Sequence, residues 1–326
     1  MCLTVVIIFA ASELSYSETS WGTVLPGYTN VSQPPPWCSF KGVTCGSNSK
    51  DAKKYRRIIG INLTSLDLKG SIPALDNLDQ MTLFNLDNNS IYGTIPPGLF
   101  LCPYRYTVCL NSISRLDLSN NQLTGTIPRT LDYRTGLVVL NLGSNQLAGT
   151  IPSTIGILTN LKELHLDHNR LTGTIPSFLR DKYRPIGTAP STIIDLILLD
   201  PVSLFNNTLN RTIGSPLTNS TGLQILNLGS NRLTGTIPSS LGKLFELASL
   251  FLDNNILTGT IPPLVQSKLG KVVLNDNFLT MGSLTSVPRS TFSYNASIIQ
   301  VQNNCLVFNN PANSSQNTDA FLCRGN

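Results

Sequence analysis

A thirteen-residue pattern of apolar and polar positions recurs along the chain, every 24 residues where copies follow one another directly. The best copies are LDLSNNQLTGTIP, LNLGSNQLAGTIP, LHLDHNRLTGTIP, LNLGSNRLTGTIP and LFLDNNILTGTIP, which begin at residues 116, 140, 164, 226 and 250. Weaker copies begin at residues 61, 84 and 202, and truncated copies begin at 272 and 299. Self-similarity at such a period indicates a repeat architecture, here of about ten coils.

Within each copy the pattern predicts a short strand followed by a turn. Apolar residues alternate with polar ones, as at Leu140 and Leu142, and this period of two indicates a strand with one buried face. The Asn that follows, Asn145 in this copy, is expected to turn inward and bond backbone groups of neighbouring coils. The Gly-x-Ile-Pro ending predicts a turn, because Pro fixes φ and donates no hydrogen bond.

These residues resemble the plant-type extracellular leucine-rich repeat, LxxLxLxxNxLxGxIP, and the resemblance extends over residues 61–306. Receptor-kinase ectodomains and polygalacturonase-inhibiting proteins are similar. The resemblance implies an α/β solenoid, which is a right-handed superhelix of about ten coils with a parallel concave β-sheet and disulfide-bonded caps.

The repeat divides the chain into four segments. Residues 1–17 are interpreted as a secretory signal, 18–58 as an N-terminal arm and cap, 59–282 as repeats, and 283–326 as the last half-repeat and the C-terminal cap. Two insertions, near residues 97–112 and 180–195, interrupt the 24-residue spacing. The stretch MCLTVVIIFAASELSYS has the apolar run and small residues of a signal, with a buried first strand as the alternative. The run is shorter than the about 20 residues that a membrane span needs.

The cysteines are predicted to be structural. If the signal is removed, Cys2 leaves with it, and the remaining cysteines are Cys38, Cys45, Cys102, Cys109, Cys305 and Cys323. An even number in a secreted chain indicates disulfides. The repeat architecture implies the local pairs 38–45, 102–109 and 305–323, and PPPWCSFKGVTC resembles the N-terminal cap of plant-type ectodomains. A zinc site is the alternative, but the chain has no CxxC and two His.

Glycosylation sequons agree with secretion. They begin at Asn30, Asn62, Asn88, Asn206, Asn210, Asn219, Asn295 and Asn313. The formal net charge of +5 is mild for 326 residues and is spread along the chain. It gives weak support for acidic partners such as uronic-acid polymers, and nucleic acid is not expected as a partner.

The concave face of the solenoid is the expected binding surface, because side chains beside the strand leucines point to it. The candidate residues on this face are Asn141, His165, Asp167, His168, Phe205, Asn227 and Phe251. His165, Asp167 and His168 stand close together in the sequence, but neighbouring coils offer no third strong ligand, so no metal site is predicted. The two histidines are expected to make binding sensitive to pH near about 6 to 7.

The insertions supply a second set of candidate binding residues. Tyr104-Arg105 and Tyr183-Arg184 fall in them, and Tyr and Arg are the residue types most often found as binding anchors. The alternative is a solvated loop in which the Arg stems pack on the Tyr rings.

Catalysis is not predicted, and neither is a cofactor. The chain has no GxSxG, no P-loop and no HExxH motif. Asp87, Asp167 and Asp253 are separated by whole coils, so no neighbouring carboxylate pair of the glycosidase kind stands out.

The function predicted from the sequence is therefore recognition outside the cell. The first hypothesis is a secreted, non-catalytic glycoprotein that binds an extracellular protein, a peptide or a cell-wall polysaccharide through its repeat surface. The second hypothesis is a structural extracellular glycoprotein that assembles with copies of itself into a fibre or matrix. Both hypotheses place the protein outside the cell or in the cell wall.

Overall fold

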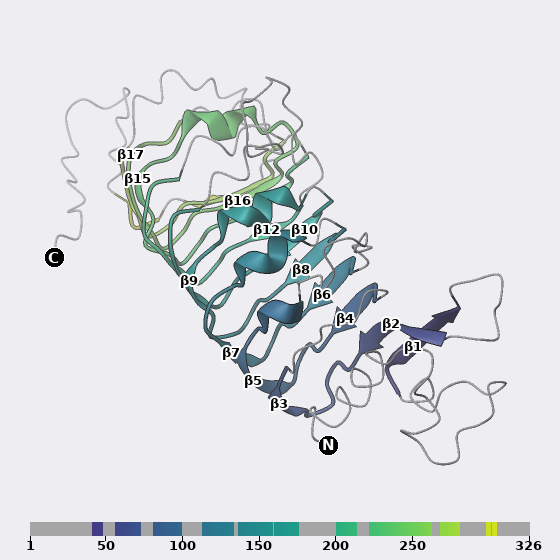
Figure 1. Ribbon diagram of the computed structural model, residues 1–326. Coiled ribbons are helices and arrows are strands. Elements are labelled where there is room, and N and C mark those ends of the chain that lie inside the picture. Colours follow the sequence, from purple (N-terminus) through teal and green to yellow (C-terminus); the bar gives the residue numbers. More distant parts are fainter. Residues whose placement is uncertain are drawn as a thin grey trace, which may run out of the picture. The chain divides into compact units, whose positions relative to one another are not determined.

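A computed structural model describes most of the repeat region of the chain (Figure 1). The described residues are 41–47, 56–72, 81–99, 113–133, 136–158, 160–175, 200–213, 222–262, 268–280, 298–300 and 302–304. They fall into two compact units. The first unit comprises Met1–Ala148 with Leu158–Leu161, and the second comprises Gly149–Ile157 with Lys162–Asn326.

The first unit begins with an antiparallel pair of strands that continues into a parallel sheet. The antiparallel strands are β1 (Val43–Ser47) and β2 (Arg56–Asn62), and the parallel ones that follow are β4 (Leu83–Asn85), β6 (Arg115–Asp117) and β8 (Val139–Asn141). Their register aligns Ile61, Phe84, Leu116 and Leu140 in one row. The predicted alternation is thus repeated in register from coil to coil.

The second unit repeats this arrangement in a wholly parallel set of strands. The strands are β10 (Glu163–His165), β12 (Val202–Ser203), β14 (Ile225–Asn227), β16 (Ser249–Phe251), β18 (Lys271–Val273) and β20 (Ile298–Gln300). The prediction of a solenoid with a parallel sheet is confirmed. The surface formed by the outward-pointing residues of these strands is called the sheet face below.

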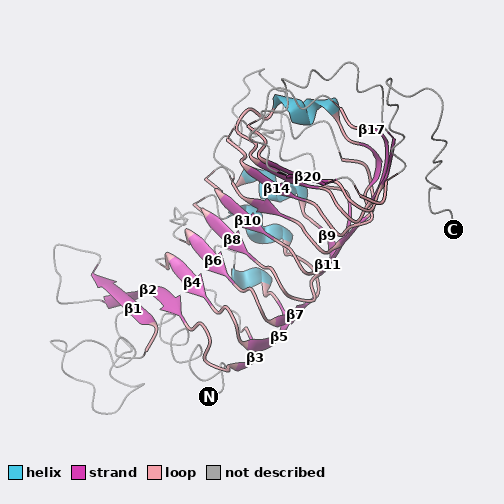
Figure 2. Cartoon of the chain, turned by 180° about the vertical axis from the view of Figure 1, so that it is seen from behind, coloured by secondary structure: helices cyan, strands magenta, loops and turns pink. Residues whose placement is uncertain are grey.

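A second set of short strands lies where the sequence predicted only a turn (Figure 2). In the first unit these outer strands are β3 (Lys69–Ser71), β5 (Ser90–Thr94) and β7 (Gln122–Thr124). In the second unit they are β11 (Arg170–Gly173), β13 (Thr208–Leu209), β15 (Thr234–Thr236), β17 (Ile256–Thr260) and β19 (Phe278–Thr280), while β9 (Ala148–Thr150) has residues of both units. The Leu-Thr-Gly-Thr part of the repeat therefore forms outer strands, which among the described residues pair into three three-stranded sheets.

The helical segments correct the α/β description. The described helices are the 3-10 turns η2 (Pro97–Leu99), η3 (Arg129–Tyr133), η4 (Ser153–Ile157) and η7 (Ser239–Lys243), coloured cyan in Figure 2. No α-helix occurs in the part of the chain that the structure describes. Each turn is too short for an α-helix because the next coil begins within a few residues, so β-solenoid is the better term.

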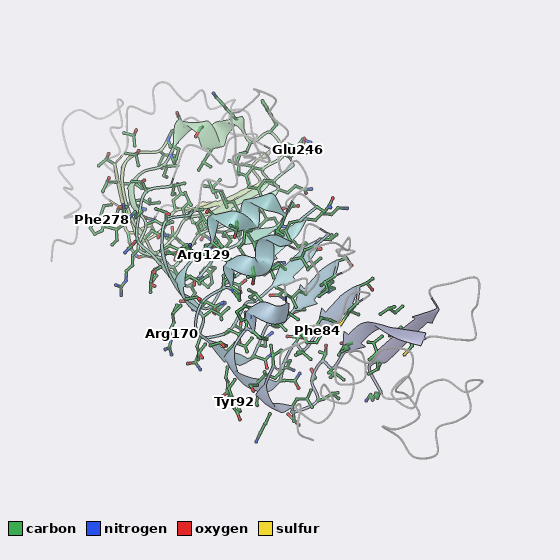
Figure 3. All side chains as sticks on the ribbon, viewed as in Figure 1. Phe84, Tyr92, Arg129, Arg170, Glu246 and Phe278 are labelled. Atoms are coloured by element: carbon green, nitrogen blue, oxygen red, sulfur yellow. The ribbon has the colours of Figure 1, made fainter. Side chains whose placement is uncertain are left out.

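The core consists of the repeated apolar positions. Leu116, Leu140, Leu226 and Leu250 are fully buried, and Phe84 points inward in Figure 3. Burial of these residues is the main favourable contribution to the stability of each coil.

The repeat Asn bonds backbone groups, and it is buried at Asn145, Asn169, Asn207, Asn231, Asn255 and Asn277 and half-buried at Asn89, Asn121 and Asn304. Asn145 donates through Nδ2 to the carbonyl oxygens of Leu118 (2.9 Å), Leu142 (3.2 Å) and Gly143 (3.1 Å), and its Oδ1 accepts from the Leu123 N–H at 3.0 Å. The same set of bonds recurs at Asn231, Asn255 and Asn277 in the second unit. The prediction that this Asn satisfies backbone groups of neighbouring coils is confirmed.

Part of the predicted N-terminal cap lies among the described residues. Cys45 in β1 is disulfide-bonded. Its partner remains a prediction because Cys38 lies outside the described residues, as do Cys102, Cys109, Cys305 and Cys323. The signal, most of the predicted N-terminal arm, most of the first insertion, the second insertion and nearly all of the C-terminal cap also lie outside them. Their boundaries and the number of coils remain predictions.

We expect Gly42→Ala to destabilise the junction between the cap and the first coil. Gly42 has φ +86°, and a Cβ there would collide with the backbone carbonyl of Asn62, whose N–H donates to the Gly42 carbonyl at 2.7 Å. A residue held in such a conformation costs about 1–3 kcal/mol. Thermal unfolding should show the loss, whereas Gly60→Ala, whose Cβ would meet its nearest neighbours at 3.5–3.6 Å, should be nearly neutral. Equal melting temperatures for the two variants would contradict this account.

Candidate binding surface on the parallel sheet

The register of the second unit gathers several predicted residues into one row. His165 in β10 aligns with Ser203, Asn227, Phe251, Val273 and Gln300 on the successive strands. The side chains of His165, Asn227 and Phe251 are each partly exposed on the sheet face. Because parallel strands lie about 4.8 Å apart, the row is about 24 Å long. Such a row matches an extended segment of about seven residues.

A second row runs beside the first and is centred on a glycine. A Cβ on Gly229 would lie 2.7 Å from Oδ1 of Asp253 and 3.2 Å from Cδ2 of Phe205, so these two side chains close over the glycine from either side. Asp167 holds the equivalent position on the coil before Phe205. The sequence indicated Asp167 and Phe205 as binding residues, whereas it gave Gly229 and Asp253 no binding role. A glycine in the sequence does not indicate a binding site, and only the register of the strands shows which side chains surround Gly229.

His168 joins the second row at the turn that follows β10. Its Nδ1 lies 3.1 Å from Oδ2 of Asp167, and its ring meets the ring of Phe205 edge-on, with centroids 5.2 Å apart. His168 has φ +51°, and Asn206, Ser230 and Asn254 occupy the same left-handed position in later coils. Asn, Asp and His are the side chains most enriched in this conformation. Backbone geometry therefore supplies a structural reason for a histidine here.

The charges on the sheet face of this unit are unevenly distributed. His165 Nε2 lies 3.8 Å from Oε2 of Glu163, so carboxylates accompany both histidines. Further along, Lys271 Nζ lies 5.0 Å from the centroid of the Phe251 ring, a cation–π arrangement. The surface therefore has an acidic part around Glu163, Asp167 and Asp253 and a basic edge at Lys271. No group of three or more His, Cys, Asp or Glu among the described residues is placed to hold a metal ion.

The two asparagines predicted to bind ligand have a structural role as well. Asn227 Oδ1 accepts from the Gly229 N–H at 3.2 Å, and Asn141 Oδ1 accepts from the Gly143 N–H at 3.1 Å. Asn141 belongs to the first unit, where its Nδ2 donates to Ser119 Oγ at 3.1 Å. Asn141 therefore lies in a polar environment within the first unit, whereas the other predicted residues of the concave face lie in the second unit.

The environment of Asn141 includes a carboxylate pair that the sequence did not predict. Ser119 Oγ lies 2.9 Å from Oδ1 of Asp87 and 2.6 Å from Oδ1 of Asp117. Asp117 is 6% exposed and lies 3.7 Å from the Arg115 guanidinium. The expectation of widely separated carboxylates was wrong here, because it compared Asp87 only with the equivalent positions of other coils, three residues after the first apolar residue of each strand. Arg115 and Ser119 account for this pair as a structural network.

Only some of the remaining predicted site residues lie among the described residues. Tyr104, Arg105, Tyr183 and Arg184 of the insertions lie outside the described residues. Among the sequons, Asn62, Asn88, Asn206 and Asn210 are exposed, and the other four also lie outside. Whether any of them carries a glycan remains a prediction.

Comparison with known proteins agrees with this architecture. Family models described as leucine-rich repeat match residues 110–172 and 222–244. Phytosulfokine receptor 1 of Arabidopsis thaliana is 32% identical over 107 residues, which are 32% of this chain and 9% of the receptor. The solved structure of the Arabidopsis receptor kinase HAESA with the peptide hormone IDA and the co-receptor SERK1 gives a TM-score of 0.60 at 29% identity, covering 74% of this chain and 37% of that one.

The chain contains leucine-rich repeats at the matched residues and is similar to plant leucine-rich repeat receptor kinases and to their solved structures. It spans only a small part of the receptors that it matches. A plant ice-binding protein shares its fold, with a TM-score of 0.58 at 24% identity over 82% of this chain and 78% of that one. Within the described residues, no helix has the length and apolar character needed to cross a membrane.

Proposed function

We propose that the sheet face of the second unit binds an extended peptide segment outside the cell, without catalysis. The observation that carries this proposal is the placement of Phe205 beside Asp253 over Gly229. Phe is among the residues most often buried, yet Phe205 and Phe251 remain partly exposed on this face. Partly exposed aromatic side chains with charged neighbours are common anchors of binding sites.

The chemistry of the surface indicates which peptide it binds. Asp167 and Asp253 flank Phe205 in the second row, so an apolar side chain resting on Phe205 has a carboxylate on each side. A basic side chain next to that apolar residue would pair with one of these carboxylates. The preferred peptide is therefore extended and carries an aromatic or aliphatic residue close to Arg or Lys.

The solved receptor structures support a peptide as the ligand class. The HAESA structure is that of a receptor kinase in complex with a peptide hormone and a co-receptor. The fibre-forming alternative has no observation of the described residues in its favour. Size-exclusion chromatography separates the two, since the peptide-binding function requires no assembly and a fibre does.

Selection of peptides from a random displayed library tests the proposal. The full chain is immobilised, and the selection is repeated with the variant Gly229→Leu, in which a side chain fills the space between Phe205 and Asp253. We expect peptides with neighbouring apolar and basic residues to be enriched on the wild-type protein and not on the variant. Enrichment of acidic peptides, or of the same peptides on both proteins, would count against the proposed surface.

The pH sensitivity that the sequence predicts for binding through His165 and His168 stays a prediction. Measuring the Kd of a selected peptide at several pH values tests it, with the double variant His165→Asn, His168→Asn, which has residue types found in sister coils, as the comparison. The same pH dependence in the wild type and in the variant would contradict it.

A further inference from the structure

The outer strands of the second unit carry a regular array of threonines. In each Thr-Gly-Thr segment both threonines point outward. Among the described residues of the second unit, Asn210 is the exception at these two positions, and in the sequence Ala148 at the unit boundary and Gly282 in the last coil also depart from threonine. We call this set the threonine array. Its members are Thr150, Thr172, Thr174, Thr212, Thr234, Thr236, Thr258, Thr260 and Thr280. All of them are exposed except Thr234, which is half-buried.

The strand pairing sets these threonines in register from coil to coil. The second threonine of one coil pairs with the first threonine of the next, as Thr236 does with Thr258 and Thr260 with Thr280. Neighbouring strands lie about 4.8 Å apart, and residues two apart along a strand are separated by about 7 Å. The array therefore repeats in two directions with nearly constant spacing.

The threonine side chains are held in fixed positions. Gly259 has φ +75°, and a Cβ on it would lie 2.8 Å from Cγ2 of Thr236, so the Thr236 methyl group occupies the place that a side chain would take. The Thr212 methyl lies over Gly235 in the same way. On the other side of the strand, Thr258 Oγ1 donates to the Gly235 carbonyl at 3.4 Å. Threonine is already stiff at χ1, so little rotamer entropy remains to be lost on binding.

The array is neutral, and this restricts the kind of ligand that it can bind. The two columns contain no ionisable side chain in the second unit, whereas exposed sheet positions of a soluble protein are ordinarily a mixture of charged and polar residues. Arg170 and Arg232 lie beside the array, two residues before the first-column threonines of their coils, and Figure 3 shows Arg170 pointing outward. A neutral surface of alternating hydroxyl and methyl groups matches a neutral ligand that offers both hydrogen bonds and apolar contact.

We propose that the threonine array binds ice. A rigid lattice of hydroxyl groups with repeats in two directions complements a ligand that is itself a two-dimensional lattice, and a face of crystalline water is neutral and supplies donors and acceptors at every point. The hydroxyls join the lattice as hydrogen-bond partners, and the methyl groups order the water that bridges between them. This activity uses the outer strands and is independent of the peptide surface on the opposite side of each coil (Figure 1).

The coil that contains Asn210 interrupts the array in its middle and gives the most specific test of the proposal. Asn210-Arg211-Thr212 replaces Thr-Gly-Thr, which puts an amide and a charge between regular coils. Asn210 also begins an exposed sequon, and a glycan there would cover the middle of the array. We therefore expect the enzymatically deglycosylated full chain to be at least as active as the untreated one. The double variant Asn210→Thr, Arg211→Gly should act at lower protein concentration than the wild type.

The experiment measures thermal hysteresis and inhibition of ice recrystallisation with the deglycosylated full chain. Thr236→Tyr with Thr258→Tyr should abolish inhibition at concentrations where the wild type is active, because two bulky rings interrupt the lattice. Tyrosine is well accepted in strands, and an unchanged melting temperature shows that the variant is folded. Ser239→Tyr, an equally exposed site on η7, and Phe205→Ala on the sheet face should both retain the activity.

Three outcomes would overturn the proposal. The first is a wild-type chain without any effect on ice, and the second is full activity in the folded tyrosine variant. The third is binding to crystalline cellulose that the tyrosine variant loses, in a chain with no effect on ice, which would assign the array to a polysaccharide. Phe205→Ala is expected to affect peptide binding and not the activity on ice. Failure of the ice proposal therefore does not contradict the proposed peptide function.

Discussion

Asn255→Ala should cost the second unit at least about 3 kcal/mol of stability, since each buried polar group left unpaired costs about 1–3 kcal/mol. Asn255 is 6% exposed and donates to the carbonyls of Leu228, Leu252 and Asp253 at 3.0–3.1 Å. Its Oδ1 also accepts from the Leu233 N–H at 2.9 Å. Alanine removes all four bonds and leaves a cavity into which neither neighbouring coil is expected to relax.

Chemical denaturation followed by circular dichroism measures this loss, and hydrogen exchange assigns it to a coil. Repeat proteins need not unfold in a single step, so protection of the Leu233 amide, which donates to Asn255 Oδ1, is the more specific readout. The matched control is Asn210→Ala, which removes an exposed asparagine two coils away. A difference of less than about 0.5 kcal/mol between the two variants would fall within ordinary surface effects and contradict the structural role of Asn255.

Phe205→Ala should weaken binding of a selected peptide by about 2 kcal/mol, or about 30-fold in Kd. Phe205 contacts the His168 ring at 5.2 Å between centroids and closes over Gly229, so its loss removes the apolar centre of the second row. Asp167 and Asp253 remain, and they preserve only the electrostatic part of the attraction.

Isothermal titration calorimetry with the same peptide measures this effect. Phe245→Ala is the matched control, because Phe245 is exposed by 50% and follows η7, outside the sheet face. We expect the control to bind as the wild type does. Equal affinity in Phe205→Ala, with both variants folded, would remove Phe205 from the binding surface.

The solenoid could be predicted because its signals are local and repeated. Leu140, Leu142 and Asn145 recur at fixed positions, and each has one physical role that holds in every coil. The outer strands escaped prediction because Thr-Gly-Thr is too short for a period to be read, and the following Ile-Pro indicates a turn. Their pairing is imposed by the stacking of coils, which brings Thr236 beside Thr258.

The candidate surface could be predicted only in part, for a similar reason. Phe205, Phe251 and the histidines were identified because their residue types depart from those of sister coils. The importance of Gly229 depends on the side chains of Phe205 and Asp253, which reach it from the two neighbouring coils, and no property of the glycine itself indicates this arrangement. His168, in contrast, drew attention as a titratable residue, and the structure adds a backbone reason for its presence.

Photo-cross-linking tests most directly the central claim that the sheet face of the second unit binds a peptide. A selected peptide with a photoreactive group in place of its apolar residue is irradiated with the full chain, and the adducts are located by mass spectrometry. The account predicts adducts in residues 163–168, 203–206, 227–229 and 251–254, and their loss in Gly229→Leu. Adducts confined to the outer strands, such as residues 234–236 and 256–260, would contradict it.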